Sequence, residues 1–217
     1  MSELDKAYEA FDMLKALDLP ISKAQLDDIE RLEEEYGKEH REDLGSYFFE
    51  KCFAIYTKRI MNIKQAKIRG EVIVAKPVLL LAIIDGISND LFKDNVFHLT
   101  DWLESRYVML MQQYMKSSQF DKPTDISNPF WHLQSDGFWH LQFSEDPQEG
   151  ATPSKRWLKE KVTLAYFDDE LWLLLQNKVW RQKLRDYIIE HKLTDDFWSG
   201  KIAAEGLGFL AAILLAA

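Results

Sequence analysis

Residues 128–141 (NPFWHLQSDGFWHL) gather four large aromatic side chains and two histidines around one Asp-Gly pair. Asp-Gly readily adopts the positive φ angles of a tight turn, so the flanking apolar residues are expected to form two short antiparallel strands that meet at Asp136-Gly137. The side chains of aromatic hairpins usually belong to the hydrophobic core, and core packing alone explains most of the aromatic residues in this segment. A structural hairpin does not obviously need His132 and His140 beside tryptophans, so these histidines are candidates for a binding role.

Patterns that support catalysis are absent from the sequence. There is no Gly-rich phosphate loop and no Gly-x-Ser-x-Gly nucleophile elbow. None of the five histidines forms the four-residue helical pair of zinc enzymes, so neither a metal nor a cofactor is expected. The single Cys52 lies in an apolar helical run, where packing is its ordinary role. We expect a protein that is not an enzyme, with a nuclease of unrecognised type as a lesser alternative.

Length and composition favour a globular protein of the cytoplasm. The 217 residues can bury one core and carry a small appended element, and one cysteine cannot form an internal disulfide. No positively charged start precedes an apolar run, so no secretory signal is expected. The apolar tail 206–217 is too short to span a bilayer as a helix. It is a core helix, a truncated end or a partner-binding tail that could mediate homo-oligomerisation.

Charge is distributed unevenly along the chain. The net charge of −9 lies entirely in residues 1–50, which hold 15 acids and 6 bases, whereas residues 51–217 hold 21 of each. The stretch from Lys51 to Lys76 contains seven bases and one acid. Such asymmetry indicates a polyanion site, or an acidic segment that covers a basic one. The alternative is that these lysines solvate a helix face.

Helical spacing of apolar residues dominates the chain and sets the predicted fold. We expect helices over 3–17, from Ser22 as N-cap to about Tyr36, over 44–62, 77–86, 100–115, 168–175 and 178–191. The helix 77–86 is apolar all round and should be the buried centre, and 158–166 fits either a strand or a helix. The predicted class is mainly α with a small antiparallel β element (α+β), divided into an acidic helical hairpin (1–43), a compact domain (44–192) and a tail (193–217).

Three segments together resemble a known family. Residues 76–85 (KPVLLLAIID), 129–139 (PFWHLQSDGFW) and 165–176 (AYFDDELWLLLQ), the last followed by 181–189 (RQKLRDYII), are similar to the recognition domain of McrA-like HNH restriction endonucleases. The best understood members are sulfur-binding domains that recognise phosphorothioate-modified DNA. The resemblance covers roughly residues 50–192, and no His-Asn-His nuclease module follows residue 192.

The resemblance implies where such DNA would bind. Sulfur is larger, more polarisable and less well hydrated than oxygen, so an apolar dimple favours it while cationic donors hold the remaining oxygens. Carried across, the basic position falls on His132 with Trp131 beside it, and the apolar wall falls on Tyr166 and Phe167. By charge and location, further phosphate contacts are expected from Lys76, Lys122 and Arg106; the alternative for Arg106 is burial against an acid.

The chain departs from the family pattern in two places. Characterised sulfur readers tend to use arginine where this chain has His132, and the wall loop here carries Asp168, Asp169 and Glu170. The leading hypothesis is a non-catalytic DNA-recognition module of a bacterial restriction or defence system, with a separate nuclease or helicase subunit as a further partner and no membrane contact. The alternative is a protein–protein adaptor on the same scaffold that has lost DNA binding.

Overall fold

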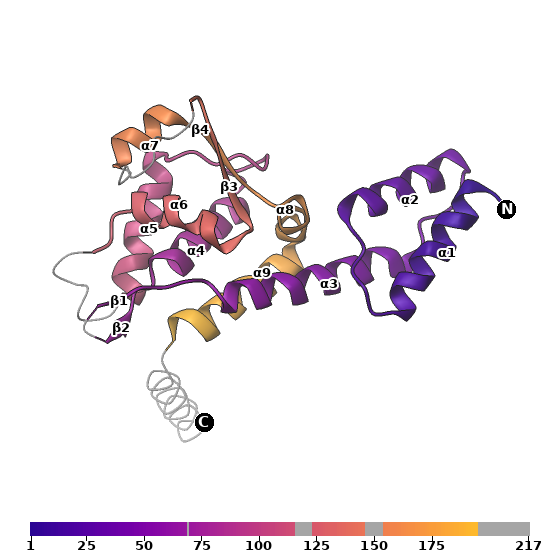
Figure 1. The fold of residues 1–217 in the computed structure, drawn as a ribbon, viewed down its shortest axis with the longest axis horizontal. Helices are drawn as coiled ribbons and strands as arrows, with labels where there is room; N and C mark the ends of the chain where they lie inside the picture. The colour runs from indigo at the N-terminus through magenta and orange to yellow at the C-terminus, as the bar shows by residue number, and fades with distance from the viewer. Residues whose placement is uncertain (69, 116–122, 146–153, 195–217) are drawn as a thin grey trace, which may run out of the picture.

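The protein is mainly helical and carries two small antiparallel sheets, as the sequence predicts. The structure is a computed structural model that describes residues 1–68, 70–115, 123–145 and 154–194. Helices α1 (Glu3–Ala16) and α2 (Lys23–Glu35), here called the N-terminal arm, project from one end of a larger body (Figure 1). In the described part of the chain, no helix is long and apolar enough to cross a membrane.

Helix α3 (Glu42–Met61) connects the N-terminal arm to the body as one continuous helix (Figure 1). Both arm helices begin with capping boxes, in which Ser2 and Ser22 accept a hydrogen bond from the backbone three residues later. The prediction of Ser22 as an N-cap is therefore confirmed. The inner half of α3 is buried through Phe48, Cys52 and Tyr56, so α3 is part of the body's core as well as a connection.

The centre of the body is α4 (Ala75–Ser88), buried nearly all round as predicted. Helices α5 (Asp101–Tyr114), α6 (Ser127–His132), α8 (Asp169–Gln176) and α9 (Lys178–Ile188) pack against it. Helix α4 begins two residues before Pro77, which still lies in the first turn, where a helix loses no hydrogen bond to proline. It also continues past Gly86 to Ser88 instead of ending there, and the ring of Phe92 packs directly on that glycine.

The predicted aromatic hairpin over 128–141 is wrong in its first half. Residues before the turn form α6 and the 3-10 helix η2 (Leu133–Asp136), and Gly137 has φ +79°. The Asp-Gly pair does supply a positive φ, but at the end of a helix, where glycine serves equally well. Trp139 then packs back on the helix, with its Nε1 donating to the Phe130 carbonyl at 2.9 Å.

The second half of that segment is strand β3 (Trp139–Phe143), which pairs with the distant β4 (Val162–Phe167) in antiparallel register, His140 opposite Tyr166. The ambiguous residues 158–166 therefore divide between α7 (Lys155–Lys161) and β4. A smaller hairpin of β1 (Lys67–Ile68) and β2 (Glu71–Val72) turns at Gly70, whose φ is +86°. Helix α9 continues into a short π-helix, η3 (Ile189–Leu193).

Candidate functional site

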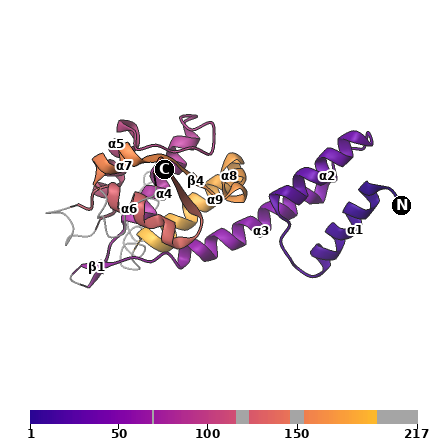
Figure 2. The same ribbon diagram turned by 45° about the horizontal axis from the view of Figure 1, so that its top comes forward.

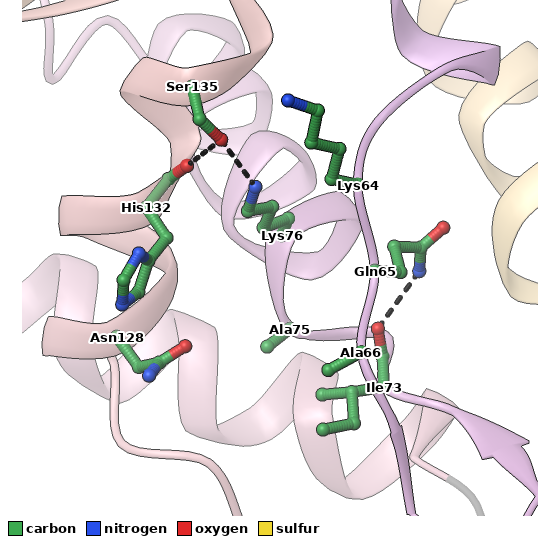
Figure 3. A pocket seen from close by; sticks show the side chains of 9 residues that line it. All are labelled: Lys64, Gln65, Ala66, Ile73, Ala75, Lys76, Asn128, His132 and Ser135. Atoms are coloured by element: carbon green, nitrogen blue, oxygen red, sulfur yellow. Dashed lines mark hydrogen bonds between the residues drawn. The ribbon is translucent and has the colours of Figure 1, made fainter.

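A cavity of about 350 Å³ lies between the segments flanking the β1–β2 hairpin, the start of α4 and helix α6. Figure 3 shows His132 and Asn128 on one side, the segment 64–66 on the other, and Lys76 and Ala75 between them. No carboxylate is among the lining side chains, which are Lys64, Gln65, Ala66, Ile73, Ala75, Lys76, Asn128, His132 and Ser135.

The lining joins apolar surface to positive charge. Ala66, Ile73 and Ala75 supply methyl and methylene groups, whereas Lys64 and His132 supply nitrogen donors. The Lys64 side chain is exposed, and its ammonium makes no ion pair with any residue that the structure describes. Such a site can accept a group that is partly apolar and partly anionic.

The buried carboxylate of Asp136 joins two segments of the cavity wall, at Lys64 and at Lys76. The Asp136 side chain is only 2% exposed and accepts a hydrogen bond from Lys76 Nζ at 2.6 Å and from the backbone N–H of Lys64 at 2.9 Å. The Lys76 ammonium also lies 3.4 Å from Ser135 Oγ, which donates to the His132 carbonyl at 2.9 Å (Figure 3). The charge of Lys76, itself 11% exposed, is therefore largely neutralised within the protein.

A second polar cluster lies on the other side of Gly137. Asp168 accepts hydrogen bonds from Tyr56 Oη at 3.0 Å, Arg59 Nη1 at 2.5 Å and His140 Nε2 at 2.6 Å. Burial raises the pKa of Tyr56, and the neighbouring Asp168 adds to the effect, so the phenol remains a donor. Arg59 Nη1 also donates to the Gly137 carbonyl at 3.2 Å. Asp136 and Gly137 thus connect this cluster to the cavity.

The carboxylate of Asp168 binds donors from α3 and β3 and does not cap α8. Asp168 precedes α8, but its carboxylate makes no capping hydrogen bond, because the three donors occupy it. His140 therefore belongs to an ion-pair cluster, and its ring lies 5.0 Å from that of Tyr166. The predicted strand partner of His140 was wrong, yet the residue does reach the surface beside a tyrosine.

The residues that the resemblance singled out fall into different environments. His132 is exposed and lines the cavity, and Trp131 is half-buried, edge-on against Phe143 and Trp157 at ring distances of 5.7 and 5.6 Å. Tyr166 is 37% exposed. Phe167, by contrast, is 1% exposed inside the core, so the expectation that it forms an accessible apolar wall is wrong. The strand alternation of β4 explains why these neighbours face opposite ways.

The predicted phosphate contacts are also divided. Arg106 Nε donates to Asp85 Oδ2 at 2.8 Å, so of the two alternatives the structure shows the pairing with an acid. Arg185 Nε reaches the other oxygen of Asp85 at 3.1 Å, and the three side chains join α4, α5 and α9. Lys122 lies outside the described residues.

Sequence reasoning missed several residues that meet at the site. Lys64 and Arg59 were part of the basic stretch, but nothing in the sequence separated them from its other lysines. Asn128 carried no signal of its own, because its place in the cavity depends on α6 being a helix. The acidic arm does not cover the cavity: it lies at the opposite end of the molecule from α6 and β1 in both views (Figures 1 and 2). Its ion pair with the basic stretch joins Asp18 to Lys51.

The model of a protein family described as "ScoMcrA-like, DNA sulfur-binding domain" matches residues 56–202. Among solved structures, the chain is similar to one titled "Sulfur binding domain of ScoMcrA complexed with phosphorothioated DNA", with 17% identity and a TM-score of 0.48 over 63% of this chain and 86% of that one. No curated protein matches.

Proposed function

The chain belongs to the family of ScoMcrA-like DNA sulfur-binding domains, as its three sequence segments predicted, and on this premise we propose that it binds duplex DNA carrying a phosphorothioate linkage. The observation that carries the proposal is the cavity beside His132, which combines apolar side chains with lysine and has no carboxylate in its lining. A carboxylate there would repel the DNA backbone. The predicted resemblance is confirmed by the family match.

The chemistry of the cavity suits one modified linkage. We place the sulfur against Ala66, Ile73 and Ala75, and the remaining oxygens toward Lys64 and His132. Burying about 40 Å² of sulfur surface contributes about 1 kcal/mol at roughly 25 cal/mol per Å², or about fivefold in affinity. The donors hold phosphate and phosphorothioate alike, so they contribute affinity and the apolar side chains contribute selectivity.

The exposed part of the second cluster extends this face along the duplex. Tyr166, His140 and Arg59 lie at the surface beyond Gly137 and offer hydrogen-bond donors to neighbouring phosphates. Trp131 supports His132 from behind through its packing on Phe143 and Trp157. Lys76 contributes less than its charge suggests, because Asp136 already neutralises it.

A titration with matched duplexes tests the proposal. One duplex carries a single phosphorothioate and the other is unmodified, and fluorescence anisotropy is followed at two salt concentrations. We expect tighter binding of the modified duplex and affinity that falls with salt for both. Lys64→Ala should reduce the slope of log affinity against log salt by about 1. Lys93→Ala, which removes an exposed lysine elsewhere, is the matched control.

Two further variants separate affinity from selectivity. Ile73→Asn should lower the preference for the modified duplex while leaving salt dependence in place. His132→Ala should weaken binding to both duplexes, with His191→Ala as the control at another exposed histidine. Equal affinity of the wild-type protein for the two duplexes would contradict sulfur recognition, and binding that ignores salt would contradict a phosphate-contacting site.

We also propose that the chain is the non-catalytic recognition part of a restriction or defence system in the cytoplasm, with cleavage or unwinding supplied by a separate nuclease or helicase chain. The family match supports the recognition role. Incubation of modified duplex with purified protein and Mg²⁺ should leave the DNA intact. Cleavage that disappears after a single carboxylate substitution would overturn the non-catalytic assignment.

One observation favours the alternative of an adaptor without DNA binding. Three bases of the basic stretch, Lys51, Arg59 and Lys76, form ion pairs within the molecule. Pairing of this kind lowers the positive potential available to a phosphate backbone. The same titration decides, because a folded protein that binds neither duplex at low salt is the result that the adaptor alternative predicts.

A further inference from the structure

The N-terminal arm has no part in the proposed DNA site. The family match begins at residue 56, so the whole arm lies outside it. The arm also lies at the far end of α3 from the cavity (Figures 1 and 2). Residues 1–43 contain 14 acidic and 6 basic residues, a charge that repels nucleic acid. The arm therefore requires a role of a different kind.

A buried carboxylate fixes the arm in one shape. Glu33 of α2 is completely buried and accepts hydrogen bonds from Tyr8 Oη of α1 at 2.8 Å and from the backbone N–H of Arg41 at 3.0 Å. His40 Nδ1 lies 2.8 Å from its other oxygen. The Arg41 guanidinium lies over the Phe11 ring, 4.8 Å from its centre. One side chain thus joins α1, α2 and the start of α3, so the arm presents its outer surface in a defined geometry.

That outer surface carries an apolar stripe. Met13 of α1 and Leu17, the C-cap residue that follows it, are 61% and 65% exposed, and with Ala10 they follow the spacing that places side chains on one side of a helix. Single exposed apolar residues need no explanation. Here the stripe is continuous with a groove of about 130 Å³ between α1 and α2, because Ala10 and its neighbour Leu14 line that groove.

The groove is narrow and mainly apolar inside, and its one charged lining residue, Asp28, pairs with Arg31 at 2.6 Å. Its apolar lining includes Ile21 and Ile29. Glu3 and Glu9 are exposed beside the stripe, and neither forms an ion pair with the residues that the structure describes. Exposed Lys6 shares the face of the stripe, but residues 1–43 hold 14 acids and 6 bases, so the arm is complementary in charge to a helix with one apolar face and basic flanks.

We propose that the stripe and groove of the N-terminal arm bind an amphipathic basic helix of a partner protein. Exposed acids beside the stripe favour Lys and Arg on the flanks of that helix, and Met13 and Leu17 provide flexible apolar contacts for its buried face. A second copy of this arm is a poor occupant, because its own acids would face the same acids. Through α3, such a partner is held at a fixed distance from the DNA-binding body.

A peptide-binding experiment on the full chain tests this. The probe is a fluorescent helical peptide with leucine at helical spacing and lysine at its other positions, and the comparison peptide has glutamate in place of each lysine. The lysine peptide should bind with an affinity that falls as salt rises, and the glutamate peptide should not bind. The double variant Met13→Glu/Leu17→Glu should weaken binding by at least about tenfold, as expected for removal of central apolar anchors.

Controls separate this inference from folding and from DNA binding. Met109→Glu, at a comparably exposed methionine of α5 (58%), should leave peptide binding unchanged. The double variant should keep the wild-type melting temperature and DNA affinity. If the wild-type protein binds the lysine peptide but binds neither duplex in the DNA titration, the proposed function is refuted and this inference stands.

Three results would overturn the inference. They are failure of the lysine peptide to bind, equal binding of the two peptides, and equal binding by wild type and double variant. Sedimentation adds a fourth: a homodimer that dissociates in the double variant would assign the stripe to a second copy of the chain.

Discussion

Replacing Asp136 by asparagine should change stability and DNA affinity in opposite directions. Asparagine keeps an oxygen for the Lys64 N–H but removes the charge 2.6 Å from the Lys76 ammonium, which is only 11% exposed. A hydrogen bond between charged groups contributes about 1.5–3 kcal/mol, and an unpaired buried charge costs about 3–5 kcal/mol. Because Ser135 and some solvent still reach the ammonium, we expect Asp136→Asn to lower the free energy of unfolding by about 2–4 kcal/mol.

A double-mutant cycle in urea isolates the pair. Lys76→Met alone leaves the carboxylate buried without its cation, whereas the combined variant leaves neither charge. The coupling free energy between the two sites should be at least about 1 kcal/mol, with an unchanged dependence on urea. Asp94→Asn, at an exposed aspartate, should change the free energy of unfolding by less than about 0.5 kcal/mol. Additive effects of the two substitutions at positions 76 and 136 would refute the reasoning.

The same variant reports on the cavity. Asp136→Asn leaves Lys76 with an uncompensated positive charge at the cavity wall, so the folded variant should bind duplex DNA more tightly than wild type. The slope of log affinity against log salt should steepen by up to about 0.9, the value for one additional phosphate contact. Unchanged or weaker binding by the folded variant would mean that DNA does not occupy this cavity.

The other predictions concern packing and pH. Gly86→Ala should destabilise the protein by about 1–3 kcal/mol, because its Cβ would lie 2.2 Å from Phe92 Cε2. Gly45→Ala, in open space on α3, should instead stabilise it by about 0.5–1 kcal/mol, and urea unfolding measures both. The hydrogen bond with Glu33 raises the pKa of His40, so its stabilising effect is complete below pH 6.5 and is lost as the pH rises through the folded pKa. Burial acts to raise the pKa of Glu33, but hydrogen bonds from His40, Tyr8 and the Arg41 backbone outweigh burial and lower that pKa. The stabilisation by ionised Glu33 is therefore present above pH 4.5 and is lost as the pH falls through the pKa of the folded state. The stability difference between wild type and His40→Gln should be largest between pH 4.5 and 6.5; a difference that grows above this range would contradict the raised pKa.

The helical elements could be predicted because their signals are local. Ser22 caps its helix as expected, and the all-apolar run of α4 is the buried centre. Gly137 shows the limit of such signals. A glycine with positive φ can join two strands or end a helix, and the choice here depends on β4, whose pairing with β3 brings together residues far apart in the sequence.

The candidate site was only partly predictable for the same reason. The sequence pointed to His132 and to the basic stretch, and both contribute to the cavity. It could not show that Lys76 forms an ion pair with Asp136, 60 residues away. Nor could it decide which of Tyr166 and Phe167 faces solvent, because the face of a strand is fixed by its partner and by the core beneath it.

Helix α3 limits how the protein can be divided. The family match begins at Tyr56, about three quarters of the way along a helix of 20 residues, or about 30 Å. A shortened chain starting there would begin in mid-helix and would lose Phe48 and Cys52, whose side chains fill the body's core. The limits of a conserved family are thus not the limits of a stable fragment. A variant that lacks the acidic N-terminal arm should therefore begin no later than Glu42, so that all of α3 is retained.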